Sequence, residues 1–242
     1  DVCSSDLGAV ELGVLAAEQL LRELEHARLV VLGHADDFHR GFFFGFANAS
    51  LHLHTVAAGL RFGRIYLGAY PDPLGFGKTP SRFSDPRRRK FANRFGVLYL
   101  GDTVKVCFLE AVLRDQRDGV LGDLPIAESE LYDRNFAEIE VINPLMMVDL
   151  RDDGPIKMGV PTDVAKGSKQ SLARKWAVAF NEHDSQVDGI IYPSRLNGHT
   201  NLAVFDRAIG KLKAVRTTKL IRAPGLADVL NDLNVAIVEP DP

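Results

Sequence analysis

The segment Val97–Arg114 constrains the fold most, because it predicts a strand, a turn and a buried helix in close succession. Val97–Leu100 is a short apolar run typical of a strand, and Gly101-Asp102 suits a turn that ends in a helix N-cap. Thr103–Arg114 carries apolar residues almost all round, so the predicted helix should be buried.

Glu110 is the single charged residue between Val106 and Leu113 of this helix. A carboxylate on a buried helix is costly unless it is paired, hydrogen-bonded or placed in a cleft. Titratable groups in such settings are common at functional sites. Glu110 is therefore the first candidate for chemistry, and the alternative is a core carboxylate paired with a neighbour.

The length and composition indicate one domain of mixed α and β structure with a sizeable core. The chain has 242 residues, of which 46% are apolar and 25% charged. Its net charge of -3 gives no support for nucleic acid as the main partner. No apolar run reaches the length of a membrane span. Two cysteines argue against a disulfide framework and for a reducing compartment, so we expect a cytoplasmic protein.

Residues 1–60 are predicted to be an N-terminal segment that precedes a domain over residues 61–242. Gly8–His26 has helical periodicity, whereas residues 34–60 have no pattern that assigns them. Asp1–Leu7 matches the in-frame translation of a common sequencing adapter, so we expect these residues to be an artefact.

The rest of the chain predicts a mixed sheet with flanking helices. Arg64–Leu67 suggests a short strand, and Gly68–Arg94 is rich in Pro, Gly, Ser and Arg, as expected of a long functional or disordered loop. A helix over Ser168–Asn181 should bury one face that carries Leu172, Trp176 and Ala179. Further predicted elements are strands at Ala137–Ile142, Met146–Leu150, Gly189–Tyr192, Asn201–Phe205, Leu212–Arg216 and Val235–Val238, and a helix at Pro224–Leu233.

Several familiar motifs are incomplete in this chain. Gly77-Lys78-Thr79 looks like the end of a phosphate-binding loop, but Asp72 stands where that motif needs its first glycine. His52 and His54 would share one face of a strand without a third metal ligand, so no metal site is predicted. The basic run Arg87–Lys90 is typical of a solvated loop and supplies no binding geometry.

Four polar residues outside the helix are candidate ligands. Arg64 and Arg82 flank the long loop, and a guanidinium suits phosphate or carboxylate, although a structural ion pair is equally compatible. Tyr99 precedes the helix and is either a functional ring or a core tyrosine with a satisfied hydroxyl. Ser194 follows a strand without a Gly-x-Ser-x-Gly elbow, which favours a hydrogen-bonding or turn-capping serine over a nucleophile.

Taken in order, these segments resemble the RES domain family, which is named for an arginine, a glutamate and a serine. The resemblance covers roughly residues 61–238. It is carried by Arg64-Ile-Tyr, Pro80-Ser-Arg-Phe-Ser-Asp-Pro86, Phe95-Gly-Val-Leu-Tyr-Leu-Gly101, Phe108-Leu-Glu-Ala111, Asp188-Gly-Ile-Ile-Tyr-Pro-Ser-Arg195 and Asn201-Leu-Ala-Val-Phe-Asp206.

The resemblance implies a fold, an activity and a partner. Members of the family are bacterial toxins of type II toxin–antitoxin pairs, neutralised by Xre-type antitoxins. They degrade NAD+ by phosphorolysis or hydrolysis on a fold similar to ADP-ribosyltransferases. We therefore expect an α+β fold with a mixed sheet and flanking helices. NAD+ would be a substrate, with inorganic phosphate as a second substrate in phosphorolysis, no cofactor, and an oligomeric complex with the antitoxin.

By resemblance, Arg64, Glu110 and Ser194 are the catalytic candidates. Glu110 would stabilise positive charge on the ribose or hold a ribose hydroxyl, and the arginines would hold the pyrophosphate or an attacking phosphate. The role implied for these residues predicts that Glu110→Gln and Arg64→Ala fold normally and lose activity. The predicted NAD+-binding set is Arg64, Arg82, Tyr99, Glu110, Ser194 and Asn201.

Two other functions stay open at this point. ADP-ribosyl transfer to a macromolecule would begin with cleavage of the same bond. An inactive RES-like module would only bind a partner protein. The decisive structural check is whether Arg64, Tyr99, Glu110 and Ser194 converge on one cleft.

Overall fold

The fold is seen in a computed structural model that describes residues 46, 49–88, 90–114, 116 and 119–239. The adapter-like residues Asp1–Leu7 and the predicted helix Gly8–His26 lie outside the described residues. The chain divides into two compact units, Asp1–Asn48 and Ala49–Pro242. All the described strands belong to the second unit, and the first of them lies before residue 61.

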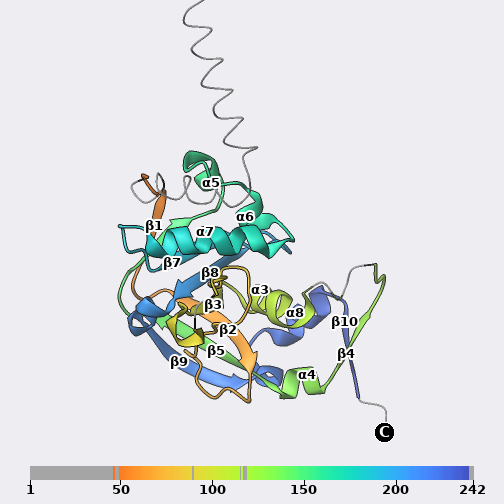
Figure 1. The fold of residues 1–242 in the computed structure, drawn as a ribbon. Coiled ribbons are helices and arrows are strands. Elements are labelled where there is room, and N and C mark those ends of the chain that lie inside the picture. The colour runs from red at the N-terminus through yellow and green to blue at the C-terminus, as the bar shows by residue number, and fades with distance from the viewer. Residues whose placement is uncertain (1–45, 47–48, 89, 115, 117–118, 240–242) are drawn as a thin grey trace, which may run out of the picture. The chain divides into compact units, whose positions relative to one another are not determined.

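An eight-stranded mixed sheet forms the centre of the second unit (Figure 1). Its strand order is β1-β6-β7-β8-β3-β2-β5-β9, and the β6–β7 pair is parallel whereas the other pairs are antiparallel. The strands are β1 (Leu53–Val56), β2 (Arg61–Leu67), β3 (Val97–Gly101), β5 (Arg134–Val141), β6 (Leu145–Asp149), β7 (Gly189–Pro193), β8 (Thr200–Phe205) and β9 (Leu212–Lys219).

The predicted strands all match observed ones, with small differences at their ends. Strand β1 was not predicted, because it is short, lies at the sheet edge and buries only Val56 fully. A separate two-stranded parallel sheet joins β4 (Leu124–Ala127) to β10 (Val235–Val238), and only β10 was predicted.

The helices lie around the sheet, with α3 against α8 and α6 against α7 (Figure 1). The longer helices are α3 (Val104–Phe108), continued by a π-helical turn η2 (Leu109–Leu113), α7 (Gln170–Glu182) and α8 (Leu226–Asp232). The short elements are α4 (Ser129–Tyr132), α5 (Gly154–Lys157), α6 (Asp163–Lys166) and the 3-10 turns η1 (Phe91–Asn93), η3 (Asp206–Lys211) and η4 (Leu220–Arg222).

Two details of the predicted helices are wrong. The cap of α3 is Thr103, whose hydroxyl accepts from the backbone N–H of Val106 at 3.1 Å. Asp102 instead accepts from the backbone N–H of Thr200 at 3.0 Å, which ties the turn to β8. In α7, Leu172 and Ala179 are only half-buried, because the inward face is Ala173, Trp176, Ala177 and Phe180.

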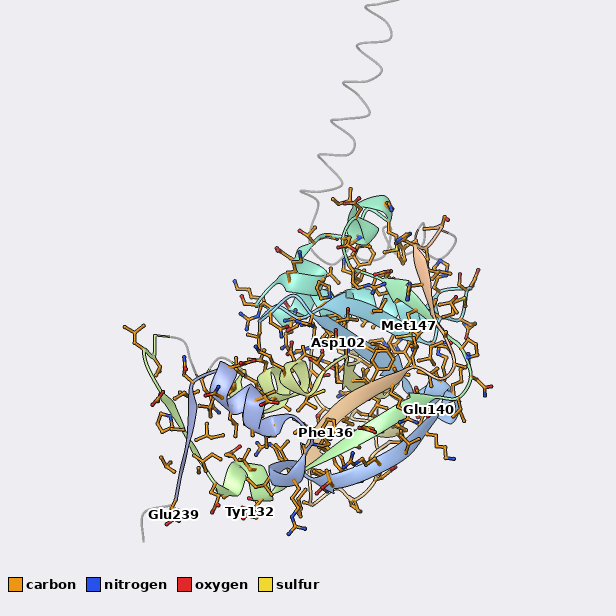
Figure 2. All side chains as sticks on the ribbon, turned by 180° about the vertical axis from the view of Figure 1, so that it is seen from behind. Asp102, Tyr132, Phe136, Glu140, Met147 and Glu239 are labelled. Atoms are coloured by element: carbon orange, nitrogen blue, oxygen red, sulfur yellow. The ribbon has the colours of Figure 1, made fainter. Side chains whose placement is uncertain are left out.

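The sheet buries a hydrophobic core on each face, as the alternating side chains of β2 show. Phe62 and Tyr66 enter one core, which also contains Met147. Ile65 enters the other core, together with Phe136. Figure 2 labels Phe136 and Met147 among the side chains of these two layers.

Strands β2 and β3 meet at a single position, Gly63 opposite Gly101, and separate beyond it. A Cβ on Gly101 would lie 2.4 Å from Val106 Cγ1 and 2.8 Å from Cys107 Sγ, and a Cβ on Gly63 would lie 2.9 Å from the same sulfur. The two glycines therefore let α3 begin directly on the backbone of the sheet. This contact sets the position of the helix that carries Glu110.

Gly101→Ala is expected to lower the free energy of unfolding by about 1–3 kcal/mol, because overpacked cores cost that much when backbone and side chains must move. Urea denaturation of the two proteins measures the difference. Gly210→Ala is the matched control, since a Cβ there meets nothing within 4 Å. Equal stability of Gly101→Ala and the control would show that α3 is free to shift at this contact.

Candidate active site

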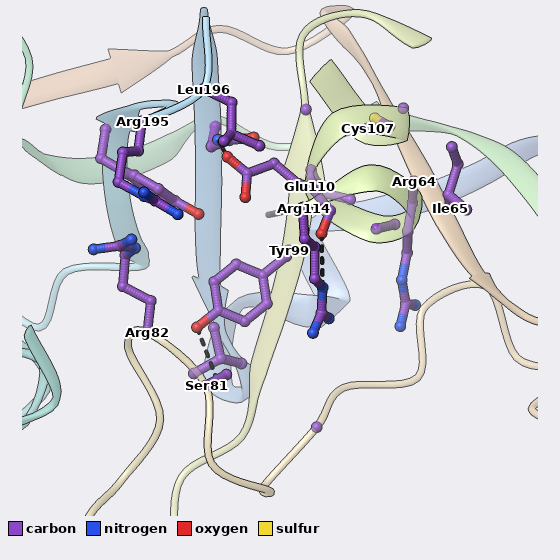
Figure 3. Close-up of a pocket in the computed structure, with 18 of the residues that line it drawn as sticks. Arg64, Ile65, Ser81, Arg82, Tyr99, Cys107, Glu110, Arg114, Arg195 and Leu196 are labelled. Atoms are coloured by element: carbon purple, nitrogen blue, oxygen red, sulfur yellow. Dashed lines mark hydrogen bonds between the residues drawn. The ribbon is translucent and has the colours of Figure 1, made fainter. Parts of the chain in front are cut away.

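A cavity of about 470 Å³ lies where β2 and β3 separate (Figure 3). Its walls come from both strands, the long loop between them, the helix α3 with its π-helical turn, and the segment that joins β7 to β8. The sequence-predicted residues that line it are Arg64, Arg82, Tyr99, Glu110 and Asn201. Ser194 reaches the site through Glu110 and lines an adjoining pocket.

The carboxylate of Glu110 is held through one of its two oxygens. Oε1 accepts from the Ser194 hydroxyl at 2.7 Å and from the Asn201 side-chain amide at 3.1 Å. Both donors are buried, at 3% and 5% exposed, whereas Glu110 is half-buried and lines the cavity. Within the described part of the chain Oε2 accepts no hydrogen bond, so it is available to a ligand.

Ser194 is arranged to orient Glu110. Its backbone N–H donates to the carbonyl of His199 at 2.6 Å, and its hydroxyl accepts from the backbone N–H of Leu196 at 3.2 Å. The hydroxyl therefore donates its proton to Glu110 and accepts from the turn that follows β7. Both contacts agree with the prediction of a hydrogen-bonding or turn-capping serine, rather than a nucleophile activated by a base.

Glu110 lies in the π-helical turn that continues α3. The backbone N–H of Arg114 donates to the carbonyl of Leu109 at 2.6 Å, which closes the wide turn. Arg114 has a positive φ (45°, with ψ -120°), and its Nε donates to the carbonyl of Glu110 at 3.2 Å. Such π turns and strained residues are frequent at functional sites.

Arg64 uses its guanidinium to hold the long loop. Nη1 donates to the carbonyl of Pro73, and Nη2 donates to the carbonyl of Gly75 at 2.6 Å. The guanidinium carbon lies 5.2 Å from the centroid of the Tyr66 ring. Burial lowers the pKa of Arg64 to about 10, so the group remains charged at neutral pH. Arg64 lines the cavity, but its fork is occupied by loop carbonyls.

Tyr99 presents its ring to the cavity while its hydroxyl is bound to the loop. The hydroxyl lies 2.9 Å from Ser81 Oγ and accepts from the backbone N–H of Phe83 at 2.8 Å. Burial of the hydroxyl raises the pKa of Tyr99, so the phenol is neutral. Tyr99 therefore offers an aromatic surface to a ligand, rather than a free hydroxyl.

Arginines stand on both sides of the cavity. Arg82 and Arg195 lie on one side in Figure 3, with Arg64 and Arg114 on the other. Nη1 of Arg82 donates to the carbonyl of Gly167 at 2.8 Å. The loop is also held from α7, since Nε of Arg174 donates to the carbonyl of Ser81 at 2.9 Å.

Tyr192, Arg114 and Arg195 line the cavity and were not predicted. Arg114 is four residues after Glu110, and this spacing places two residues of a helix on the same side. The spacing was the one sequence pattern that could have indicated Arg114. Arg195 directly follows Ser194. Tyr192 lies two residues before Ser194, in an apolar strand whose side chains are expected in the core. Cys107 also lines the cavity, but burial raises the pKa of its thiol to about 12, which leaves it protonated.

The phosphate-loop-like segment and the basic run make structural contacts. Lys78 donates to the carbonyl of Ala92 at 3.0 Å, and the loop around it leads into no long helix. The predicted solvated run is partly wrong, because Arg87 is half-buried against the buried carboxylate of Asp85 (Nη2–Oδ2 2.7 Å) and also pairs with Glu182. Among the described residues no three or more His, Cys, Asp or Glu gather as metal ligands.

The fold is an α+β fold with a mixed sheet and flanking helices, as predicted. The structure is similar to a chain in the crystal structure of the M. tuberculosis MbcT-MbcA toxin-antitoxin complex, with a TM-score of 0.54 and 21% identity. The match covers 74% of this chain and 92% of that one.

Across the described residues no helix combines the length and apolar character needed to cross a membrane.

The chain belongs to the RES domain family, whose model matches residues 59–224. It is also 39% identical over 127 residues to "Probable toxin y4kH" of Sinorhizobium fredii, a match over 52% of this chain and 100% of that protein. The resemblance on which the site residues were assigned is therefore confirmed at the level of the family.

Proposed function

We propose that this protein is the toxin of a toxin–antitoxin pair and that it consumes NAD+ by breaking the nicotinamide–ribose bond. The observation that carries the enzymatic part is the carboxylate of Glu110, which is fixed through one oxygen and open at the other within a cavity flanked by arginines. The toxin part is supported by the similarity to a probable toxin and to a solved toxin–antitoxin complex.

Glu110 suits this reaction because the bond breaks with positive charge building on the ribose. A carboxylate held in place before the reaction stabilises that charge without reorganising. The same carboxylate can instead hold a ribose hydroxyl through an interaction that strengthens in the transition state. Ser194 and Asn201 act through Glu110, because they fix Oε1 and leave Oε2 for the substrate.

The arginines suit the anionic part of a dinucleotide. A guanidinium binds phosphate oxygens through two parallel hydrogen bonds. Both Nη atoms of Arg64 hold the loop. Arg82, Arg114 and Arg195 line the cavity, and Arg82 and Arg114 each also donate to a backbone carbonyl. These three residues are our candidates for the pyrophosphate of NAD+ or for an attacking phosphate. The cavity of about 470 Å³ is within the usual range of small-molecule sites.

The family resemblance implies an Xre-type antitoxin as the partner. It would bind the toxin in an oligomeric complex and block NAD+ consumption. The chain similar to ours was solved within a toxin–antitoxin complex. An enzyme that consumes NAD+ would act in the cytoplasm, where this substrate is held. A small neighbouring reading frame that encodes a helix-turn-helix protein would support the pairing.

Purified protein free of antitoxin is expected to release nicotinamide from NAD+. The reaction is followed by chromatography with and without inorganic phosphate. A phosphorylated ADP-ribose product identifies phosphorolysis, and free ADP-ribose identifies hydrolysis. Labelled ADP-ribose attached to a macromolecule would favour transfer instead. Folded protein that turns over no NAD+ in either condition would contradict the proposal.

A further inference from the structure

Tyr192 is a buried residue whose hydroxyl lines the cavity and has no hydrogen-bond partner among the described residues. Tyr192 lies on β7, is 5% exposed and lines the cavity. Within the described part of the chain its hydroxyl makes no hydrogen bond. Tyrosines with a buried ring usually hydrogen-bond through the hydroxyl, and this hydroxyl is open to the cavity. A ligand that enters the cavity would supply the missing partner.

The sheet register places Tyr192 on the same face as the donors of Glu110. Tyr192 is directly opposite Asn201 of β8, and Asn201 is directly opposite Gly101 of β3. Opposite residues of antiparallel strands project from the same face. Asn201 donates to Glu110, so Tyr192 is the cross-strand neighbour of a residue that holds the Glu110 carboxylate. Gly101, on the other side of Asn201, has no side chain.

The ring of Tyr192 is fixed in orientation. It packs edge-on against Phe83, with the ring centroids 4.9 Å apart and the planes at 72°. Phe83 is itself fully buried, and its backbone N–H donates to the hydroxyl of Tyr99. The Tyr192 hydroxyl is therefore placed before a ligand binds, which lowers the entropy lost on binding.

The Tyr192 phenol is a permanent donor at neutral pH. Burial, with smaller contributions from Tyr99 and Glu110, raises its pKa well above the usual value, and Arg82 opposes this shift. A neutral phenol beside a carboxylate and a cation has one proton to offer. It suits a neutral oxygen acceptor on the substrate, and the arginines remain for the phosphates.

Tyr66 shows what a purely structural phenol looks like in this fold. Its hydroxyl is buried and has no partner among the described residues, whereas the hydroxyl of Tyr192 is open to the cavity. Tyr66, however, packs in the hydrophobic core of the opposite face and does not line the cavity. The two tyrosines differ in access to a ligand, which makes Tyr66 a matched control.

We infer that Tyr192 is a substrate-binding residue whose hydroxyl donates a hydrogen bond to a neutral oxygen of the nucleotide, beside the group that Glu110 contacts. This inference rests on the proposed function. NAD+ offers two such oxygens near the bond that breaks: the carboxamide carbonyl of the nicotinamide ring and a hydroxyl of the attached ribose. Both are neutral acceptors of the same hydrogen bond.

The test compares Tyr192→Phe, Tyr66→Phe and the unaltered protein. Calorimetry measures their affinities for nicotinamide, pyridine and ADP-ribose, and steady-state assays give KM and kcat for NAD+. For Tyr192→Phe we expect an affinity loss of about tenfold for one oxygen-bearing ligand, the size of one lost hydrogen bond. Its melting temperature should not fall, because the hydroxyl that is removed makes no hydrogen bond to the described residues. Tyr66→Phe should bind every ligand as the unaltered protein does.

Each outcome bears on the inference. Weaker nicotinamide binding with unchanged pyridine binding identifies the carboxamide, and weaker ADP-ribose binding identifies the ribose hydroxyl. If Tyr192→Phe binds and turns over all ligands like Tyr66→Phe while the unaltered protein cleaves NAD+, the inference is overturned and the proposed function stands. A lower melting temperature of Tyr192→Phe also overturns it, by showing a structural role. No binding or turnover by the unaltered protein overturns the proposed function, and the inference with it.

Discussion

Glu110→Gln is expected to keep the fold and to lower kcat for NAD+ cleavage by about a hundredfold to a thousandfold, the usual effect of removing one preorganised electrostatic group. The glutamine carbonyl oxygen can replace Oε1 and accept from Ser194 and Asn201. The amide nitrogen then takes the place of Oε2, so the negative charge is lost where the ribose becomes positive. The substitution therefore separates charge from shape.

Kinetic constants and thermal unfolding of Glu110→Gln provide the measurement. Ser194→Ala is the informative companion, because it keeps the carboxylate and removes one of its two donors. Because Ser194 only positions Glu110, Ser194→Ala should lower kcat less than Glu110→Gln, which removes the charge itself. Full activity of Glu110→Gln would move the chemistry to another residue, and an unfolded Glu110→Gln would give the carboxylate a structural role.

The central strand and helix could be predicted because their signals are local. Val97–Gly101 is an uninterrupted apolar run, and the next segment has helical periodicity broken only at Glu110. The choice of Thr103 over Asp102 as the cap is not local. Either side chain can cap a helix, and Asp102 is taken by the backbone N–H of Thr200, far away in sequence.

The cavity could not be predicted, because it arises from how distant segments pack. Nothing near Gly63 or Gly101 in sequence shows that β2 and β3 part after one pair of residues. Tyr192 occurs in an apolar strand, and such a tyrosine reads as core until the cavity beside it is known. The short helices α4, α5 and α6 have too few residues to show a periodicity.

Arg64 is the residue whose expected role changes most once the structure is known. The family resemblance places it in the catalytic set, and this assignment stays a prediction. The structure shows its two Nη atoms bound to the carbonyls of Pro73 and Gly75, on the loop that continues to Ser81 and Arg82 in the cavity wall. A positioning role through this loop therefore has a direct structural basis.

Arg64→Ala is expected to lower the free energy of unfolding by about 1–3 kcal/mol, since it removes two hydrogen bonds from a charged donor to loop carbonyls. The loosened loop should raise KM for NAD+ by about tenfold or more, because a small misplacement of binding groups is costly. Limited trypsin digestion should cut faster at the loop residues Lys78 and Arg82. Arg64→Lys should be intermediate, because one ammonium cannot span two carbonyls as a planar fork does.

Arg61→Ala provides the control, because Arg61 is on the same strand but its side chain is 58% exposed, in ion pairs of a kind worth little. It should match the unaltered protein in stability, KM and digestion. The result that decides between the two roles is how activity is lost in Arg64→Ala. A fall in kcat with normal stability and an uncut loop would return Arg64 to direct contact with the substrate. A raised KM with a weakened loop would establish that the arginine of this family signature acts here by holding the wall of the cavity in place.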